Sequence, residues 1–148
     1  LKVRGTLVGS PAMGALANMT ALKRLDLSET QVGDVGLADL SKLTSIQDLD
    51  LWATQVTDAG LSHLTSLTNL TILNLDQTHV GDEGLIQIGK LSTLKNLILR
   101  STQITDDGIE HLSTLTNLED LNVEFCTSLG DTGKKRIQEK LPKVVLTQ

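Results

Sequence analysis

A pattern of hydrophobic residues recurs every 24 positions along most of the chain, and this period limits the folds that the chain can adopt. The segments that start at Leu22, Ile46, Leu70 and Leu94 share the pattern LxxLxLxxTxVxDxGLxxLxxLTx. Fixed periods of about 20–50 residues are typical of proteins in which each repeat is one small unit that contacts mainly its neighbours. The sequence therefore predicts a stack of repeats rather than one globular core.

The same register divides the whole chain into about six repeats that form a single domain. The opening repeat, residues 1–21, lacks its first three residues, so we expect the chain to begin within a repeat and to be part of a longer protein. The last repeat carries one extra residue and is followed by a terminal strand at 143–148. The repeats after the first are 22–45, 46–69, 70–93, 94–117 and 118–142.

Each repeat contains two kinds of hydrophobic spacing. The alternation at Leu25-Asp26-Leu27 has the period of two that buries one face of a short strand. In the second half the spacing becomes three, as at Leu61, Leu64 and Leu67, which places these side chains on one helical face. We expect one such helix at about 35–43. Because an isolated helix needs about 12–15 residues to be even marginally stable, neighbouring repeats must hold this one in place.

Two polar columns accompany the hydrophobic pattern. An aspartate precedes each helical segment, where its carboxylate is expected to cap the helix by accepting from free backbone N–H groups. A threonine follows each strand, and its hydroxyl is expected to satisfy backbone groups of the turn. The glycine two residues after each aspartate is expected to serve the turn into the helix. The aspartates are Asp34, Asp58, Asp82, Asp106 and Asp131, and the threonines are Thr6, Thr30, Thr54, Thr78 and Thr102.

The recurring LxxLxL signature resembles that of leucine-rich repeat proteins along essentially the whole chain. In the last repeat, Cys126, Leu129, Asp131 and Gly133 form a C-x-x-L-x-D-x-G run that is similar to the cysteine-containing repeats of F-box-type leucine-rich proteins. Threonine replaces this cysteine in the other repeats, a version that also resembles long bacterial leucine-rich repeat proteins. The resemblance implies an α/β fold, a right-handed leucine-rich repeat solenoid with a concave parallel β-sheet and short convex helices. The chain contains no F-box and no cysteine-rich flanking caps.

The composition argues against nucleic-acid and membrane partners. The chain has 13 Lys and Arg against 18 Asp and Glu, a net charge of -5, whereas nucleic-acid binding needs clustered cationic residues. Residues 26–124 carry 4 positive and 16 negative charges, while residues 1–25 and 125–148 carry net charges of +4 and +3. The uncharged stretches are too polar for a membrane span. We therefore expect an acidic middle section that attracts basic partners.

The residues needed for catalysis or for a cofactor do not come together in this pattern. His63 and His111 occupy the same helix column two repeats apart, which corresponds to roughly 10 Å and is too far for one metal ion. His79 belongs to a turn column, and Cys126 takes an inward position with no histidine placed to activate it. We therefore predict that the chain is not an enzyme and needs no cofactor or metal.

The outward positions of the strands form the candidate partner-binding surface. Trp52 is the only tryptophan and lies among acidic residues, and tryptophan and arginine dominate the hot spots of interfaces. We expect Trp52 to be exposed, although it could instead lie flat over its own strand. The candidate residues are Trp52, Asp50, Asp48, Asp76, Ile72, Ile98, Arg100 and Asn74.

Two classes of function remain, a protein-binding scaffold and an architectural spacer within a longer solenoid. A narrower version of the first is the substrate-recognition part of an F-box-type ubiquitin ligase. The acidic surface predicts a protein or peptide partner with basic character and salt-sensitive binding. Self-association is also expected, because Leu1, Val3 and Met13 should lack a covering neighbour at the N-terminal edge. The N-x-T sequons at Asn18 and Asn69 follow from the repeat and do not indicate secretion, so an intracellular location is the expectation.

Overall fold

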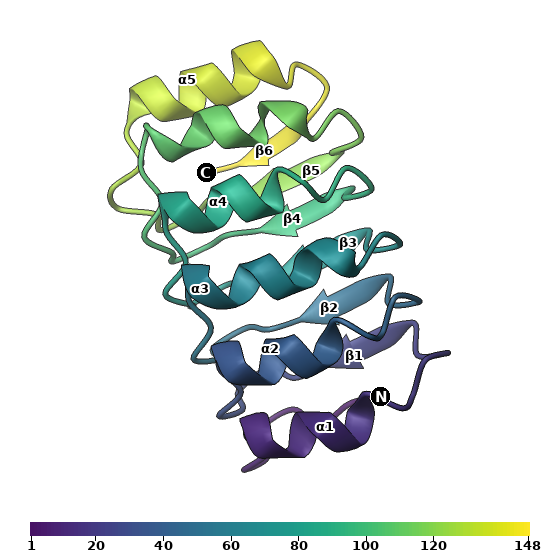
Figure 1. Cartoon of the computed structure of the whole chain (residues 1–148). Helices are drawn as coiled ribbons and strands as arrows, with labels where there is room; N and C mark the ends of the chain where they lie inside the picture. The colour runs from purple at the N-terminus through teal and green to yellow at the C-terminus, as the bar shows by residue number, and fades with distance from the viewer.

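Six parallel strands form one sheet along the molecule in a computed structural model that describes residues 1–148 (Figure 1). They follow one another in sequence order, and residues from the same column of the repeat pair directly, as in Leu25↔Leu49 and Leu49↔Leu73. This confirms the predicted α/β fold and its register. The strands are β1 (Arg24–Asp26), β2 (Asp48–Asp50), β3 (Ile72–Asn74), β4 (Asn96–Ile98), β5 (Asp120–Asn122) and β6 (Val145–Thr147).

Short helices stack on one side of this sheet (Figure 1). The helix predicted at 35–43 runs from Asp34 to Leu40. The elements are η1 (Ser10–Ala12), α1 (Met13–Leu16), α2 (Asp34–Leu40), α3 (Asp58–Leu61), η2 (Ser62–Ser66), α4 (Asp82–Ile88), η3 (Gly108–Thr114) and α5 (Asp131–Lys140), where η denotes a 3-10 helix.

In two repeats a 3-10 helix takes the place of most or all of the α-helix, at η2 and at η3. This difference was not predicted from the sequence. A leucine spacing of three suits the three residues per turn of a 3-10 helix as well as an α-helical face. The segments concerned are rich in Ser and Thr, whose hydroxyls bond to the carbonyl three residues earlier. Thr65 Oγ1 donates to Ser62 O at 2.8 Å, and Ser113 Oγ donates to Glu110 O at 2.7 Å. Such local bonds compete with regular α-helix geometry.

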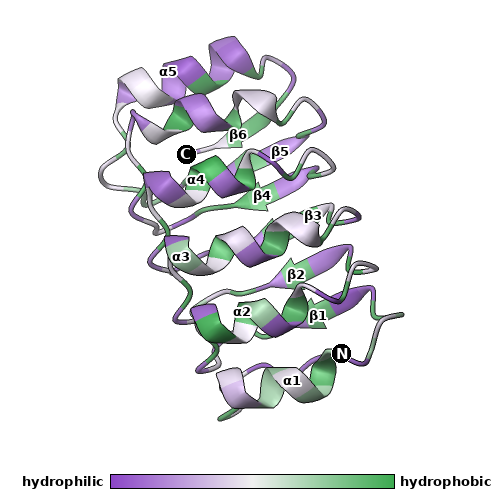
Figure 2. Ribbon diagram, in the orientation of Figure 1, coloured by the Kyte–Doolittle hydropathy of each residue, from purple (hydrophilic) through white to green (hydrophobic).

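The core lies between the sheet and the helices and consists of the leucine columns. It forms one cluster of 35 buried residues, and the middle residues of the strands, such as Leu49 and Leu73, have no exposed surface. Figure 2 shows that hydrophobic and hydrophilic residues alternate along the ribbon of the helices and strands, as expected for elements that bury one face. Because the middle strand residue points inward, its two neighbours point to solvent.

The opening repeat differs from the prediction. Met13 was expected to lack a covering neighbour, but it is fully buried because α1 packs against α2 and Met13 joins the common core. Leu1 remains 43% exposed and Val3 is half-buried. The segment before β1 adds only two isolated bridges, Lys2↔Asp26 and Gly9↔Gln31, rather than a further strand.

The aspartate column does not cap its own helices, so that prediction was wrong. Asp34, Asp58 and Asp82 are the first residues of their helices, and Asp106 lies just before η3. The carboxylates of these four aspartates reach the following repeat. Asp82 Oδ1 accepts from Thr105 N at 2.8 Å, and Oδ2 accepts from Thr105 Oγ1 at 2.7 Å. Asp34 makes the same pair of bonds to Thr57. The donor N–H precedes the next helix and has no intrahelical acceptor, which is why a carboxylate from the neighbouring repeat stabilises it.

The same bonds continue along the stack. Asp58 Oδ1 accepts from Gly81 N, and Asp106 Oδ1 accepts from Gly130 N, each at 2.7 Å. In the opening repeat Ser10 Oγ takes the place of the carboxylate and accepts from Gly33 N at 3.1 Å. We call this series of contacts the inter-repeat ladder. It joins every pair of consecutive repeats from the first to the last.

The ladder also explains the glycine column, which was wrongly attributed to the turn into the helix. A Cβ atom on Gly84 would lie 2.5 Å from Asp58 Oδ1, and one on Gly133 would lie 2.5 Å from Asp106 Oδ1. The backbone φ angles of these glycines are not positive, so conformational freedom is not what they provide. Glycine is needed because the aspartate of the preceding repeat approaches the helix too closely for any side chain.

The threonine column has the predicted role. Thr54 Oγ1 donates to Leu51 O and Thr78 Oγ1 donates to Leu75 O, both at 2.7 Å inside the coil. Cys126 replaces this threonine in the last repeat, and its thiol donates to Leu99 O at 3.0 Å. These groups satisfy carbonyls of the turn that follows each strand.

The substitution Asp82→Ala should lower the free energy of unfolding by about 1–3 kcal/mol, because both donors of Thr105 lose their acceptor. Urea denaturation followed by circular dichroism measures this value. As a control, Asp107→Ala in the same turn region should change it by less than about 0.5 kcal/mol. A double-mutant cycle with Thr105→Val should show coupling; additive effects would mean that Asp82 acts on its own helix instead.

Candidate functional site

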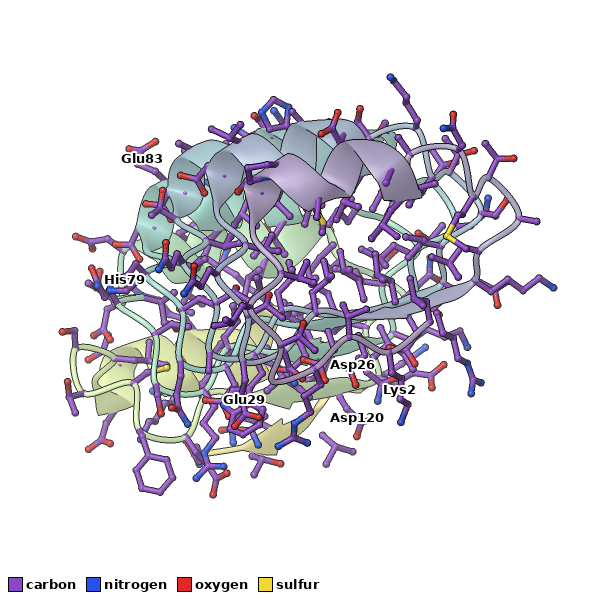
Figure 3. All side chains as sticks on the ribbon, turned by 90° about the horizontal axis from the view of Figure 1, so that it is seen from below. Lys2, Asp26, Glu29, His79, Glu83 and Asp120 are labelled. Carbon is purple, nitrogen blue, oxygen red and sulfur yellow. The ribbon has the colours of Figure 1, made fainter.

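The outward residues of strands β1–β5 form one continuous surface, which we call the sheet face. All of its side chains are half-buried or exposed. In Figure 3, Asp26 and Asp120 lie on this side of the molecule, and Glu83 lies on the helix side. The sheet face consists of Arg24, Asp26, Asp48, Asp50, Ile72, Asn74, Asn96, Ile98, Asp120 and Asn122.

The parallel register arranges the sheet face in two rows across the strands. One row pairs Asp48, Ile72, Asn96 and Asp120 in turn, and the other pairs Asp50, Asn74, Ile98 and Asn122. Five of the predicted site residues, Asp48, Asp50, Ile72, Asn74 and Ile98, are therefore neighbours on adjacent strands. The surface changes from acidic on β2 to aliphatic and amide on β3 and β4, and returns to acidic on β5.

Some polar residues of the sheet face also hold the turns that follow the strands. Asp50 Oδ1 accepts from Trp52 N at 3.0 Å, and Asn74 Oδ1 accepts from Asp76 N at 3.0 Å. Asp50 and Asn74 were predicted to serve partner binding alone. A carboxylate or amide here meets the backbone N–H two residues later, a local bond that Asp and Asn favour. The Oδ1 atom of each side chain is therefore occupied by a hydrogen bond within its own turn.

The acidic end of the sheet face borders a shallow pocket of about 360 Å³. Asp26, Asp48 and Asp50 line it together with Lys2 and Arg24. Burial raises the pKa of Asp50; the hydrogen bond from the Trp52 N–H opposes this, and the neighbouring charges of Asp26 and Asp48 add to it. The Asp50 carboxylate is therefore a charge that the protein compensates only in part.

The three remaining predicted residues, Trp52, Asp76 and Arg100, lie at the carboxyl ends of the strands. We call this border the rim and include in it Arg4, Glu29, Trp52, Asp76, Arg100, Glu124 and Phe125. Trp52 is half-buried rather than exposed as predicted. The Arg4 guanidinium lies 4.7 Å from the centre of its ring, and Arg4 Nε bonds to Glu29 Oε2 at 2.9 Å. Trp52 thus packs within the fold, and its indole Nε1 is buried without a hydrogen-bond partner.

Asp76 was predicted to be an open acidic residue, but it is only 8% exposed. Its Oδ2 lies 3.9 Å from Arg100 Nη1, and its Oδ1 is buried without a hydrogen-bond partner. Burial raises the pKa of Asp76, and the positive charge of Arg100 offsets only part of that effect. A free surface role for Asp76 is therefore wrong, because its neighbours on both sides in the column are large side chains.

Phe125 is a site residue that was not predicted from the sequence. It is 64% exposed, and the Arg100 guanidinium lies 4.7 Å from the centre of its ring. Its φ angle is +58°, in the left-handed region that glycine occupies in the opening repeat at Gly5. The available signal was composition, since Phe125 and Trp52 are the only aromatic residues of the chain. Both lie at the rim, and both stack with an arginine.

No group of three or more His, Cys, Asp or Glu residues has an arrangement that could hold a metal ion. Cys126 is buried, in keeping with the predicted packing role. None of the helices combines the length and the apolar character that crossing a membrane requires.

The substitution Asp76→Asn tests the burial of this carboxylate. The folded-state pKa is raised above the unfolded value, so ionised Asp76 destabilises the fold at neutral pH, and this cost disappears as the pH falls through the folded pKa. The variant should unfold at a higher temperature than the parent at pH 7, with a difference that shrinks toward pH 4 in calorimetry. A lower unfolding temperature at pH 7 would mean that the pairing with Arg100 outweighs the burial.

A family model described as Leucine Rich repeat matches residues 18–41, 66–89, 90–113 and 114–135. No curated protein sequence matches the chain. Among solved structures, the chain is similar to an internalin (InlF) from Listeria monocytogenes, with 26% identity and a TM-score of 0.78 over 91% of this chain and 37% of that one. Internalin C2 (InlC2) from the same organism shows 32% identity and a TM-score of 0.69 over 90% and 55% of the two chains.

A leucine-rich repeat protein from Leptospira interrogans shares the fold at 22% identity, with a TM-score of 0.62 over 90% of this chain and 38% of that one. The chain thus spans 37% to 55% of the length of these structures. The family model covers more than half of the chain, and its repeats coincide with the strand, helix and ladder pattern described above. The chain therefore belongs to the leucine-rich repeat family.

Proposed function

We propose that this chain is a non-catalytic module that binds a protein or peptide partner on its sheet face. Leucine-rich repeat proteins generally act as scaffolds for protein interaction, and internalin-like proteins are typically binding modules without catalytic activity. The observation that carries the proposal is the pair Ile72 and Ile98, two aliphatic side chains that remain half-exposed in the middle of an otherwise polar sheet. The core does not need them, because the leucines between them already fill it.

Charge favours a partner with basic character. Asp48, Asp50 and Asp120 flank the two isoleucines, and residues 26–124 carry 16 negative against 4 positive charges. Complementary charge speeds association and adds specificity, and salt screens it. Binding should therefore weaken as the ionic strength rises.

The size of the sheet face limits the contact. The five strands of the sheet face, about 4.8 Å apart, span only ~19 Å, and the two outward residues of each strand lie ~7 Å apart. A standard protein interface buries about 800 Å² on each partner. This surface alone therefore suits a short segment, and a folded partner needs added contacts at the rim, where Trp52 and Phe125 lie.

The finer assignment to cysteine-containing, F-box-type repeats rests on Cys126 alone, and that thiol packs against the Leu99 carbonyl. A ubiquitin-ligase role has no other support. The spacer role is the outcome that remains if the sheet face binds nothing.

A photo-crosslinking amino acid at position 98 should capture a partner from extract of the source organism, whereas the same residue at position 83, on the helix side, should not. With the purified partner, Ile98→Asp should weaken binding at least tenfold, or about 1.4 kcal/mol, while Glu83→Gln leaves it unchanged. Calorimetric titration measures both. Equal crosslinking at the two positions would favour the spacer role. So would an Ile98→Asp variant that binds the partner as tightly as the parent chain does.

A further inference from the structure

We propose that the sheet face takes an extended peptide that runs across the strands and presents a basic residue, an aliphatic residue and a second basic residue at positions i, i+2 and i+4. The inference rests on the proposed function and narrows it to one class of partner. It follows from the order of side chains across β2–β5, from their spacing, and from the hydrogen-bonding groups that the fold leaves free.

The acidic groups are spaced to match such a peptide. Asp48 and Asp50 lie on β2 and Asp120 lies on β5, so three strand intervals separate them, which corresponds to ~14 Å. An extended peptide advances about 3.3 Å per residue and therefore covers ~13 Å between positions i and i+4. Side chains at i, i+2 and i+4 also point to the same side of an extended chain. Two basic residues of one peptide can thus reach both acidic groups at once.

The acidic groups at both ends lack strong cationic partners within the chain. Neither Asp50 nor Asp120 forms an ion pair, and Asp48 Oδ2 is 4.0 Å from the Nε atom of Arg24, whose side chain is 84% exposed. Asp120 Oδ2 accepts from Asn96 Nδ2 at 2.8 Å, which leaves its Oδ1 without a hydrogen bond from the protein. Burial is the main cause of the raised pKa of Asp50, and no neighbouring cation lowers that pKa.

The middle of the sheet face offers an aliphatic contact for position i+2. Ile72 on β3 and Ile98 on β4 lie diagonally across one strand interval, because Ile72 pairs with Asn96 and Asn74 pairs with Ile98. Position i+2 of a bound peptide lies ~7 Å from each acidic group, which is between β3 and β4. An aliphatic side chain at this point covers both isoleucines.

Asn74 and Asn96, which lie beside the two isoleucines on β3 and β4, can bind the peptide backbone. Asn96 uses Nδ2 for Asp120, so its Oδ1 is free to accept. Asn74 uses Oδ1 for the Asp76 N–H, and its amide lies beside Asp50. Because an amide NH2 group carries two donors, one N–H is left to donate to the peptide. A peptide group carries one donor and one acceptor, and the two asparagines supply one of each.

The test uses the whole chain and fluorescein-labelled heptapeptides with blocked ends, measured by fluorescence anisotropy at low salt. The probe is Gly-Lys-Ser-Leu-Ser-Arg-Gly. Its matched control, Gly-Lys-Ser-Leu-Arg-Ser-Gly, has the same composition and charge but turns the arginine to the opposite side. The parent chain should bind the probe at least fivefold more tightly than the control. Equal affinities would overturn the inference, because they would show general charge attraction only.

Variants of the chain then test the two acidic ends. Asp50→Asn and Asp120→Asn should each weaken binding of the probe at least fivefold, and Glu83→Gln should not change it. Both variants are expected to fold, because the chain itself carries Asn at the same columns, in Asn74 and Asn96, and Asn74 makes the same turn bond as Asp50. Thermal unfolding checks this. Binding that is unaffected by Asp120→Asn would overturn the two-ended arrangement.

The crosslinking and peptide-binding experiments together distinguish failure of the peptide inference from failure of the proposed function. If the crosslinker at position 98 captures a partner but the probe and the control bind equally, the peptide inference fails and the binding role stands. If position 98 captures nothing while the probe binds selectively, the peptide inference stands and the proposed natural protein partner fails. If both experiments fail, the binding role and the peptide inference fail together.

Discussion

The hydrogen bonds that Asp34, Asp58, Asp82 and Asp106 accept from the next repeat are the interaction on which the rest of the structure depends. The helices are too short to be stable alone, so each must be held by its neighbours. Asp82 and Thr105 show how this is done, since one carboxylate satisfies a backbone N–H and a hydroxyl of the following repeat. The close approach leaves no room for a side chain at the facing position, as at Gly108, and this couples the aspartate and glycine columns.

This coupling sets what can vary without loss of the fold. In a stack where each repeat contacts mainly its neighbours, the ladder and the leucines fix the spacing between repeats, and the threonines hold the turn within each repeat. The outward strand side chains contribute only local turn bonds, as at Asp50 and Asn74, and the bond from Asn96 to Asp120. The sheet face can therefore carry Asp, Asn and Ile side by side, and its chemistry is free to match a partner.

The rim differs from the sheet face because its side chains are long and contact one another. Arg4 covers Trp52, and Arg100 lies between Asp76 and Glu124 while it stacks on Phe125. The outcome is uneven exposure along the rim. Phe125 is open to solvent, whereas Asp76 is buried with a raised pKa. The rim thus combines packing with the largest exposed aromatic surface of the chain.

The sequence by itself determined the period, the strand register, the inward leucines and the threonine bonds, because these depend on spacings of two, three and 24 residues that can be counted. It also placed Asp48, Asp50, Ile72, Asn74 and Ile98 on one surface, since strand residues alternate between faces. Only the tertiary structure decided which repeat each aspartate serves, why glycine follows it, and how far Trp52, Asp76 and Met13 are buried. These features depend on contacts between side chains that lie about 24 residues apart, and their distances and sizes are not encoded in the pattern of any single repeat.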